Sequence, residues 1–152
     1  MSQRVLVTAG ASGIGLAMAK GFAATGARVW VTDVDAGALA ALPVGIHGVL
    51  VDVVDEPAMA ALFVDLQTEL GGLDVLCANA GIAGPTALVE DISLADWRTC
   101  VSVNLEGAFL AAKYTAPLMK AQNSGAIIIT SSTAGQNGYP NRAPYSAAKW
   151  AV

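Results

Sequence analysis

The sequence predicts an α/β fold in which a parallel sheet carries helices on both faces. Short runs rich in β-branched residues alternate with longer alanine- and leucine-rich segments of helical period, a pattern typical of βαβ units rather than hairpins or helix bundles. The strand-like runs are apolar along nearly their whole length, as expected of strands covered on both faces. With 152 residues, we expect residues 1–152 to form a single domain with one core.

Five segments are predicted to be strands, namely residues 4–8, 28–33, 46–52, 73–78 and 126–131. Four segments between them have helical character: residues 13–25, 36–42, 56–70 and 94–122. Glycine or proline marks most of their ends. Asp55 is expected to cap the third helix, and Ser93 with Asp96 the fourth, because their side-chain oxygens can accept the free N–H groups of a first turn.

Residues 147–151 have the composition of the first turns of one more helix. A helix this short is marginal alone, and a sheet that ends with residues 126–131 leaves one edge and one face uncovered. We therefore expect the domain to continue beyond Val152.

Composition excludes several classes of protein. Hydrophobic residues make up 55% of the chain and charged residues 13%, which excludes a disordered chain. Apolar stretches are too short to span a membrane. The net charge is −4, and no lysine or arginine lies between Arg28 and Arg98, where 11 of the 12 acidic residues lie. Without a basic stripe, neither nucleic acid nor an anionic membrane is an expected partner.

The two cysteines and the single histidine predict no metal site. Cys77 and Cys100 lie in apolar surroundings without CxxC spacing, so we expect them to be buried, reduced and structural. His47 lacks partners for a ligand cluster or a triad and is expected to be a solvated histidine at a strand end. Reduced thiols favour a cytoplasmic protein, as do the glycines that interrupt any signal-peptide core near the N-terminus.

Residues 8–15, Thr-Ala-Gly-Ala-Ser-Gly-Ile-Gly, directly follow the first strand and open the first helix. Glycines there permit a tight turn and close approach to a pyrophosphate, whose charge meets the free N–H groups of the helix. Ser12, Gly13, Ile14 and Gly15 are thus candidate cofactor-binding residues. Ordinary strand-to-helix turns also use glycine, so the loop alone leaves nucleotide binding open.

Asp33 closes the second strand 18 residues after Gly15, where dinucleotide-binding folds place an acid that accepts hydrogen bonds from the adenosine ribose. The glycine loop has no lysine or arginine, so a 2′-phosphate would meet an uncompensated carboxylate. At about 4 Å and an effective dielectric of roughly 20 the repulsion is ~4 kcal/mol before screening, which favours NAD over NADP. Asp33 could instead be a turn residue before Val34 and Asp35.

Two other strand ends carry candidate contacts to the cofactor. Asp52 ends the third strand, where an acid can accept the adenine amino group, although a solvated aspartate is nearly as consistent with this position. Asn79, Ala80 and Gly81 follow the fourth strand, and open α/β sheets bind ligands at the carboxyl ends of their strands.

Tyr145 and Lys149 have i, i+4 spacing at the start of the final helix and therefore share one face. A lysine ammonium some 4 to 5 Å away favours the phenolate and would lower the pKa of the tyrosine by roughly two units, which makes it a usable base. Alone, the pair is more typical of a surface tyrosine packed on a lysine stem.

Two polar groups strengthen the catalytic interpretation. Ser131 and Ser132 end the fifth strand at the same sheet edge as the glycine loop, where a hydroxyl can hydrogen-bond a substrate oxygen. Asn104 is a polar amide in an apolar helical segment, so it either caps a helix break or holds a water molecule.

Taken together, these motifs closely resemble the short-chain dehydrogenase/reductase family, from residue 4 to the last residue. They are Thr8-Ala9-x-x-x-Gly13-Ile14-Gly15, Asp33, Asp52-Val53, Asn79-Ala80-Gly81, Asn104-Leu105-x-Gly107, Ser131-Ser132-x-Ala134-Gly135 and Tyr145-Ser-Ala-Ala-Lys149, in the family's order and with its usual 13-residue step from Ser132 to Tyr145. The resemblance implies a Rossmann-type doubly wound sheet, with five of an expected seven strands present. It adds Val53 to the cofactor contacts.

The resemblance also implies a catalytic tetrad. Tyr145 would be the acid/base, Ser132 would orient the substrate oxygen, Lys149 would bind the nicotinamide ribose and tune Tyr145, and Asn104 would hold a relay water. Two positions depart from the family pattern, because Ala9 replaces the first glycine of the loop and Ala78 the first asparagine of N-N-A-G. Nothing matches the family's last two strands or the segment that covers the substrate.

The favoured hypothesis is an NAD-dependent oxidoreductase that interconverts a secondary alcohol and a ketone. One alternative is a catalytically inactive nucleotide-binding module. Another is a non-catalytic assembly protein, since relatives pair the long helix across a dimer interface and Leu105, Ala108, Phe109 and Ala112 would give it an apolar face. A homodimer or homotetramer is expected. The substrate stays open, because its specificity depends on the loops 81–92 and 134–143.

Overall fold

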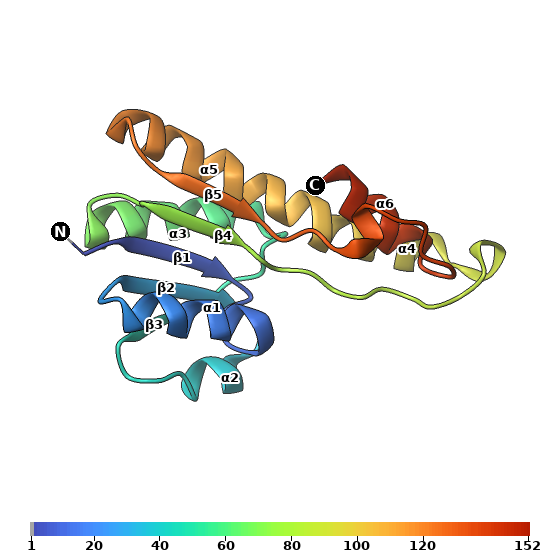
Figure 1. Ribbon diagram of the computed structural model, residues 1–152, viewed down its shortest axis with the longest axis horizontal. Helices are drawn as coiled ribbons and strands as arrows, with labels where there is room; N and C mark the ends of the chain where they lie inside the picture. Colours follow the sequence, from blue (N-terminus) through green and yellow to red (C-terminus); the bar gives the residue numbers. More distant parts are fainter. Residues whose placement is uncertain (1) are drawn as a thin grey trace.

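The computed structural model describes residues 2–152, which form a fully parallel five-stranded sheet (Figure 1). The strands are β1 (Arg4–Thr8), β2 (Arg28–Asp33), β3 (Ile46–Leu50), β4 (Val75–Ala78) and β5 (Ala126–Ile129), in the spatial order β3-β2-β1-β4-β5. The chain first builds outwards on one side of β1 and then on the other. This confirms the predicted α/β fold and gives the strand order of a Rossmann fold, whose order reverses between β1 and β4.

Three strands are shorter than predicted, and beside the ends of two of them backbone groups bond to side chains. Asp52 accepts the N–H of Val54 in a turn after β3, and the N–H of Leu73 donates to Gln122 before β4 begins. Thr130 to Ser132 leave the sheet after β5 and enter the loop described below.

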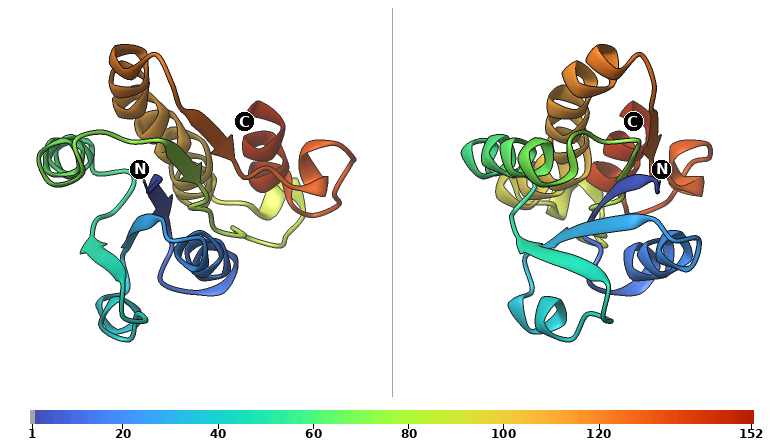
Figure 2. Two further views of the ribbon diagram at one scale, coloured as in Figure 1. Left: turned by 60° about the vertical axis from the view of Figure 1, so that its left-hand side comes forward. Right: turned by 90° about the vertical axis from the view of Figure 1, so that its left-hand side faces the viewer.

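Helices cover both faces of the sheet (Figure 2). They are α1 (Gly13–Ala24), α2 (Ala36–Ala40), α3 (Glu56–Leu70), α4 (Leu94–Val101), α5 (Gly107–Gln122) and α6 (Ala143–Ala151), with short 3-10 turns η1 (Val89–Asp91) and η3 (Thr133–Gly135). Both predicted caps are present: Asp55 accepts the N–H of Ala58 and Ser93 that of Asp96, each at 3.0 Å. The single helix predicted over 94–122 is wrong in one respect, because a π-helical turn, η2 (Ser102–Glu106), separates α4 from α5.

Successive side chains of each strand point to opposite faces of the sheet, so the core has one part on each face. Val5 and Val7 point toward α1, where Ala19 is buried, whereas Leu6 points toward α3 and α5 and packs with Met59 and other buried side chains. Cys77 packs with Val5 and Val7 on the α1 side of the sheet. Both Cys77 and Cys100, which lies on α4, are buried and free, as predicted.

β5 is the edge strand that the sequence predicted. Ile127, Ile128 and Ile129 are 40%, 45% and 39% exposed. The only strand that pairs with β5 within residues 2–152 is β4. Across the same residues, no helix has the length and apolarity to cross a membrane, and no cluster of side chains is arranged to hold a metal. His47 is exposed near the start of β3 and packs against Trp30, with ring centroids 4.1 Å apart and the ring planes tilted by 35°.

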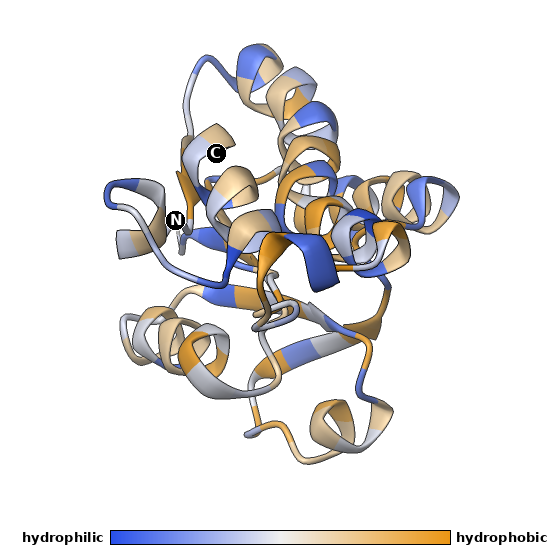
Figure 3. Cartoon of the chain, turned by 90° about the vertical axis from the view of Figure 1, so that its right-hand side faces the viewer, coloured by the Kyte–Doolittle hydropathy of each residue, from blue (hydrophilic) through white to orange (hydrophobic). Residues whose placement is uncertain are grey.

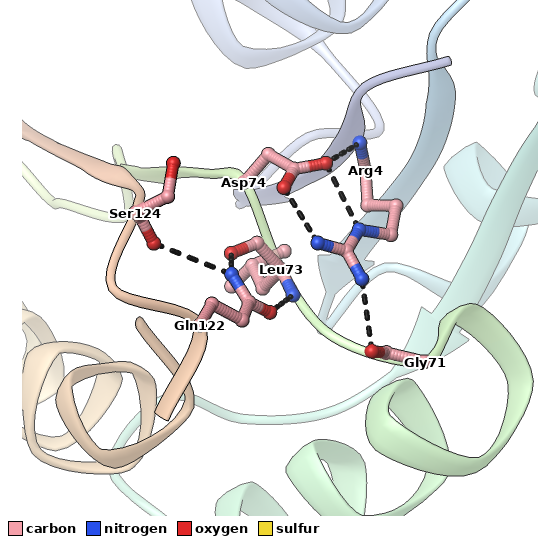
Figure 4. Close-up of polar contacts among 6 residues, drawn as sticks. All are labelled: Arg4, Gly71, Leu73, Asp74, Gln122 and Ser124. Atoms are coloured by element: carbon pink, nitrogen blue, oxygen red, sulfur yellow. Dashed lines mark hydrogen bonds and ion pairs between the residues drawn. The ribbon is translucent and has the colours of Figure 1, made fainter. Parts of the chain in front are cut away.

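A polar network joins the amino ends of β1 and β4 (Figure 4). The Arg4 guanidinium donates to both oxygens of Asp74, at 2.6 and 2.9 Å, and to the carbonyl of Gly71 at 2.8 Å. Beside it, the Gln122 amide accepts from the N–H of Leu73 and donates to its carbonyl, both at 2.9 Å. The network therefore fixes the start of β4 against β1 and the end of α5.

Asp74 is expected to make stability depend on pH. Its hydrogen bonds from Arg4 hold the pKa of the carboxyl below its usual value. A lowered folded-state pKa contributes stability above the unfolded pKa of about 3.9, and this contribution is lost as the pH falls through the folded-state pKa. Asp74→Asn should cost about 1–2 kcal/mol at pH 7 and flatten the acid limb of urea unfolding measured from pH 7 to 3. Exposed Asp65→Asn is the control, and an equal change in both variants would contradict the assignment.

Candidate active site

A cleft of about 560 Å³ lies at the carboxyl ends of the strands, where five separate segments meet. Its walls come from the loops after β1, β4 and β5, from Asn104 in η2 and from the start of α6. Figure 1 shows α4 and α6 beyond the arrowheads of the strands, and Figure 3 faces this end of the molecule. Of the predicted residues, the cleft brings together Ser12, Gly13, Ile14, Asn79, Gly81, Asn104, Ser132, Tyr145 and Lys149.

The loop after β1 can take only glycine at two positions. A Cβ on Gly15 would lie 2.1 Å from the carbonyl oxygen of Ala9, and one on Gly10 would lie 2.6 Å from the Cβ of Val31. Ser12 precedes α1 but makes no side-chain hydrogen bond to its first turn. The positive end of α1 therefore faces the cleft without a cap, as an anion site requires.

Ala9 has a positive φ of +49°, a conformation that glycine adopts freely and alanine does not. This is the position where the family pattern has a glycine. The left-handed region costs an L-residue about 1–2 kcal/mol. The neighbouring Gly10 does not relieve the strain by moving, because it is packed against Val31.

Ala9→Gly is expected to stabilise the protein. Relief of the strain exceeds the extra entropy of the unfolded chain and leaves a net gain of about 0.5–1 kcal/mol, or about 2–3 °C in Tm for a domain of this size. Thermal unfolding of the full-length protein measures it. Ala41→Gly is the matched control, since Ala41 is exposed with φ −94° and should lose stability. If Ala9→Gly lowers the Tm as well, the backbone at Ala9 is not strained.

Asp33 lies at the end of β2 and contacts the glycine loop directly. Its Oδ2 accepts the N–H of Ala11 at 3.1 Å, and its Oδ1 accepts the N–H groups of Val34 and Asp35 at 2.9 and 3.2 Å. The structure is therefore compatible with both interpretations of Asp33, as a turn residue and as an acid near a ribose. The carboxylate stabilises the turn after β2, and it also lies beside the glycine loop.

Asp52 and Val53 lie apart from the cleft. Asp52 is exposed and accepts the N–H of Val54 at 3.1 Å. The Val53 side chain is buried in the core, where a Cβ on Gly107 would lie 2.7 Å from its Cγ2. Only the main chain of Val53 is thus available to a ligand.

Asn79 and Ala80 fasten β4 to β1. The N–H groups of both residues donate to the Thr8 hydroxyl at 3.0 Å, and the Asn79 amide donates to the carbonyls of Thr8 and Ala9 at 3.1 and 3.3 Å. Asn79 lines the cleft and also holds the glycine loop in place.

Asn104 occupies the π-helical turn, which confirms a helix break at this residue. Its amide nitrogen donates to the carbonyls of Cys100 and Ile82 at 2.8 and 2.9 Å, while its buried Oδ1 has no hydrogen-bond partner within residues 2–152. A Cβ on Gly81 would lie 2.6 Å from this oxygen and 3.3 Å from Lys149 Nζ. A buried acceptor without a protein partner fits the predicted water site.

Lys149 and Tyr145 project from α6 into the cleft. Lys149 is only 4% exposed, and its Nζ donates to the Thr130 carbonyl at 2.8 Å and lies 5.8 Å from the centre of the Tyr145 ring. Burial lowers the pKa of the Lys149 ammonium. Because Lys149 is buried, the pair is not the surface packing that the spacing alone allowed.

The two serines after β5 have different partners. Ser131 donates to the carbonyl of Lys149 at 2.7 Å, which ties the end of β5 to α6. Ser132 Oγ accepts the N–H of Ala134 at 3.2 Å, so its hydroxyl proton is left to donate into the cleft.

Comparisons with known proteins identify the family and the fold. The sequence model of the short chain dehydrogenase family matches residues 3–152. The chain belongs to this family. Among curated short-chain dehydrogenases, it is 43% identical to a cis-4-hydroxycyclohexanecarboxylate dehydrogenase of Sinomonas cyclohexanicum over 97% of its length, and 37% identical to an NAD(+) 2-dehydro-3-deoxy-L-rhamnonate dehydrogenase of a Sphingomonas strain over 97%.

Solved short-chain dehydrogenases show the same fold. The crystal structure of levodione reductase superposes on 98% of the chain with a TM-score of 0.94 and 32% identity, and a short-chain dehydrogenase of Streptomyces avermitilis superposes on 99% with a TM-score of 0.92 and 29% identity. The chain spans 61% and 60% of the two curated relatives, and 61% and 57% of these two structures.

The sequence analysis missed three contacts of this short-chain dehydrogenase site. Thr8 accepts two N–H groups, the Thr130 carbonyl holds Lys149, and Arg142 donates to the carbonyl of Ala83 at 2.8 Å. A polar residue at a strand end signals the first. The other two contacts have main-chain carbonyls as acceptors. Every residue has such a carbonyl, so these contacts could not be predicted from the sequence.

Proposed function

We propose that the full-length protein is an NAD-dependent oxidoreductase that interconverts a secondary alcohol and a ketone, with Tyr145 as acid/base. The observation that supports this most strongly is that Asn104, Ser132, Tyr145 and Lys149, from three separate segments, line one cleft that also includes Ser12, Gly13 and Ile14. A cleft at the reversal point of the strand order is where an open α/β sheet binds its ligand.

The residues present fit a dinucleotide. The uncapped start of α1 and the closely packed Gly15 suit a pyrophosphate, and Asp33 suits the hydroxyls of an adenosine ribose. No basic residue lies between Thr8 and Ala19 to compensate a 2′-phosphate beside Asp33, which favours NAD. When bound, the nicotinamide supplies the donor or acceptor for a hydride.

Tyr145 moves the proton in the proposed reaction. In oxidation its phenolate oxygen takes the hydroxyl proton of the substrate, and in reduction its phenol returns a proton to the carbonyl oxygen. Ser132 donates a hydrogen bond to the same substrate oxygen, because its lone pair is engaged by Ala134. The buried Lys149 ammonium stabilises the phenolate in a region of low dielectric, and Asn104 Oδ1 holds a water beside it.

The names of the relatives span several kinds of substrate. They include a hydroxycyclohexanecarboxylate, a deoxyrhamnonate, a hydroxysteroid and an acyl carrier protein thioester. All fit alcohol–ketone chemistry, and none fixes the substrate of this protein.

The experiment uses the full-length protein. Titration with NADH should quench tryptophan fluorescence or transfer energy to the nicotinamide, and a panel of secondary alcohols, polyols and hydroxy acids should reduce NAD, read at 340 nm. Binding of NADH without turnover of any compound in either direction would contradict the enzymatic proposal and favour a binding module.

We also infer that the protein forms a homo-oligomer through α4 and α5. Of the predicted apolar face, Ala108 belongs instead to the protein's own core, whereas Phe109 is 60% exposed. Exposed aromatic surface on a long helix supports association. Sedimentation of the full-length protein should show a dimer or tetramer that Phe109→Glu weakens, and a monomer throughout would contradict the proposal.

A further inference from the structure

The charge of the cleft is opposite to that of the chain. Among the residues that line it, the only charged side chains are Arg142 and Lys149, although the chain has a net charge of −4. The other lining residues are small, polar or apolar, and none is acidic. An uncompensated positive charge in a concave site attracts an anion.

Lys149 is committed to the catalytic group, since it is buried and donates to the Thr130 carbonyl. Arg142 is the cation that a substrate can reach. It immediately precedes α6 and lies three residues before Tyr145, so it shares the cleft wall with the proposed acid/base.

Arg142 is also held in place. One guanidinium nitrogen donates to the carbonyl of Ala83 at 2.8 Å, and the carbonyl of neighbouring Asn141 accepts the N–H of Ala87 at 3.0 Å. These bonds join the loop after β4 to the loop before α6. No carboxylate forms an ion pair with Arg142 in the part of the chain that the structure describes.

The remaining donors of Arg142 are suited to a planar anion. A guanidinium has five N–H groups in a fixed fork, and one contact to Ala83 leaves most of them free. Two parallel bonds to a carboxylate match this fork.

We propose that the substrate carries a carboxylate, which Arg142 binds while Tyr145 acts on the alcohol or ketone carbon of the same molecule. This inference rests on the proposed function, and it makes Arg142 a specificity-determining residue for hydroxy acids or keto acids.

The test compares each acid with a neutral analogue in the full-length protein. Cyclic and short-chain hydroxy acids, among them 4-hydroxycyclohexanecarboxylate and 3-hydroxybutyrate, are assayed with their carboxamides in wild type, Arg142→Gln and Arg142→Lys. At least one acid should exceed its amide by about 10-fold or more in kcat/KM, and Arg142→Gln should raise KM for the acid by about 30- to 100-fold with little change in kcat. The loss for the amide should be at least about 10-fold smaller than the loss for the acid, because losing the bond to Ala83 affects both compounds alike, and Arg142→Lys should retain part of the preference.

A binding measurement separates this inference from the proposed function. The same acids are titrated calorimetrically into the protein saturated with NADH. An acid that binds wild type but not Arg142→Gln, and that wild type does not oxidise in the assay with NAD, would uphold the carboxylate site and reject the Tyr145 chemistry. The inference is wrong if no acid binds or reacts better than its amide, if Arg142→Gln impairs acid and amide equally, or if it weakens NADH as much as the acid.

Discussion

Tyr145→Phe is expected to lower kcat by roughly 10²–10⁴-fold, the range that general acid–base catalysis supplies. The substitution removes only the phenolic oxygen, which is the atom that exchanges a proton with the substrate. The ring remains and still packs beside Lys149, whose Nζ lies 5.8 Å from its centre. Affinity for NADH should therefore change by less than about twofold, because the ring and the Lys149 ammonium beside it stay in place.

The chain offers a matched control in Tyr139. This residue lines the same cleft, is 50% exposed and precedes α6, so Tyr139→Phe removes the same atom from a neighbouring position. Turnover in this variant should stay within about threefold of wild type. The acid/base assignment fails if Tyr145→Phe retains wild-type kcat, or if both variants lose activity to the same extent. Steady-state rates at 340 nm with fluorescence titration of NADH give both quantities.

The position of Lys149 could be predicted from its spacing to Tyr145, but its burial could not. The i, i+4 pair correctly placed Tyr145 and Lys149 in one cleft, because helix geometry is local. The burial of Lys149 depends on Thr130, Gly81 and Asn104, which come from other segments. Periodicity cannot report such contacts between distant segments, so two interpretations stayed open until the structure placed the residues.

The interruption of the long helix, in contrast to the burial of Lys149, had a signal in the sequence. Composition favoured one helix over 94–122. The segment includes Pro117, a helix breaker, yet α5 continues through it, so propensity does not locate the interruption. The π-helical turn is instead associated with Asn104, whose amide donates to Ile82 in the loop after β4 as well as to Cys100. Asn104 was the one residue that conflicted with the apolar period, and that conflict was the sequence signal for the break. Local inconsistencies of this kind are expected at functional sites.

Asp33→Asn is expected to shift the cofactor preference toward NADP by about 10- to 100-fold in the ratio of kcat/KM values, because it removes the charge that repels a 2′-phosphate. The ~4 kcal/mol available at close range is reduced by screening, since Asp33 is only half-buried. Asp33→Ala removes the charge and also the acceptors of three N–H groups, from Ala11, Val34 and Asp35. It should shift the ratio similarly but also weaken both cofactors, because the glycine loop loses one of its hydrogen bonds to β2 and keeps the bond from Gly10 to Thr32.

Asp35 separates a specific effect from a general change in charge. Its carboxylate lies two residues further along and accepts the N–H of Ala38 at the start of α2. Asp35→Asn removes the same charge from the same turn, but it lacks the contact with Ala11, so the preference should change by less than about threefold. If Asp33→Asn leaves the ratio unchanged while NADH still binds, the proposed NAD preference has another origin. If Asp35→Asn shifts the ratio equally, the effect comes from the charge of the whole turn, and Asp33 loses its special role beside the ribose.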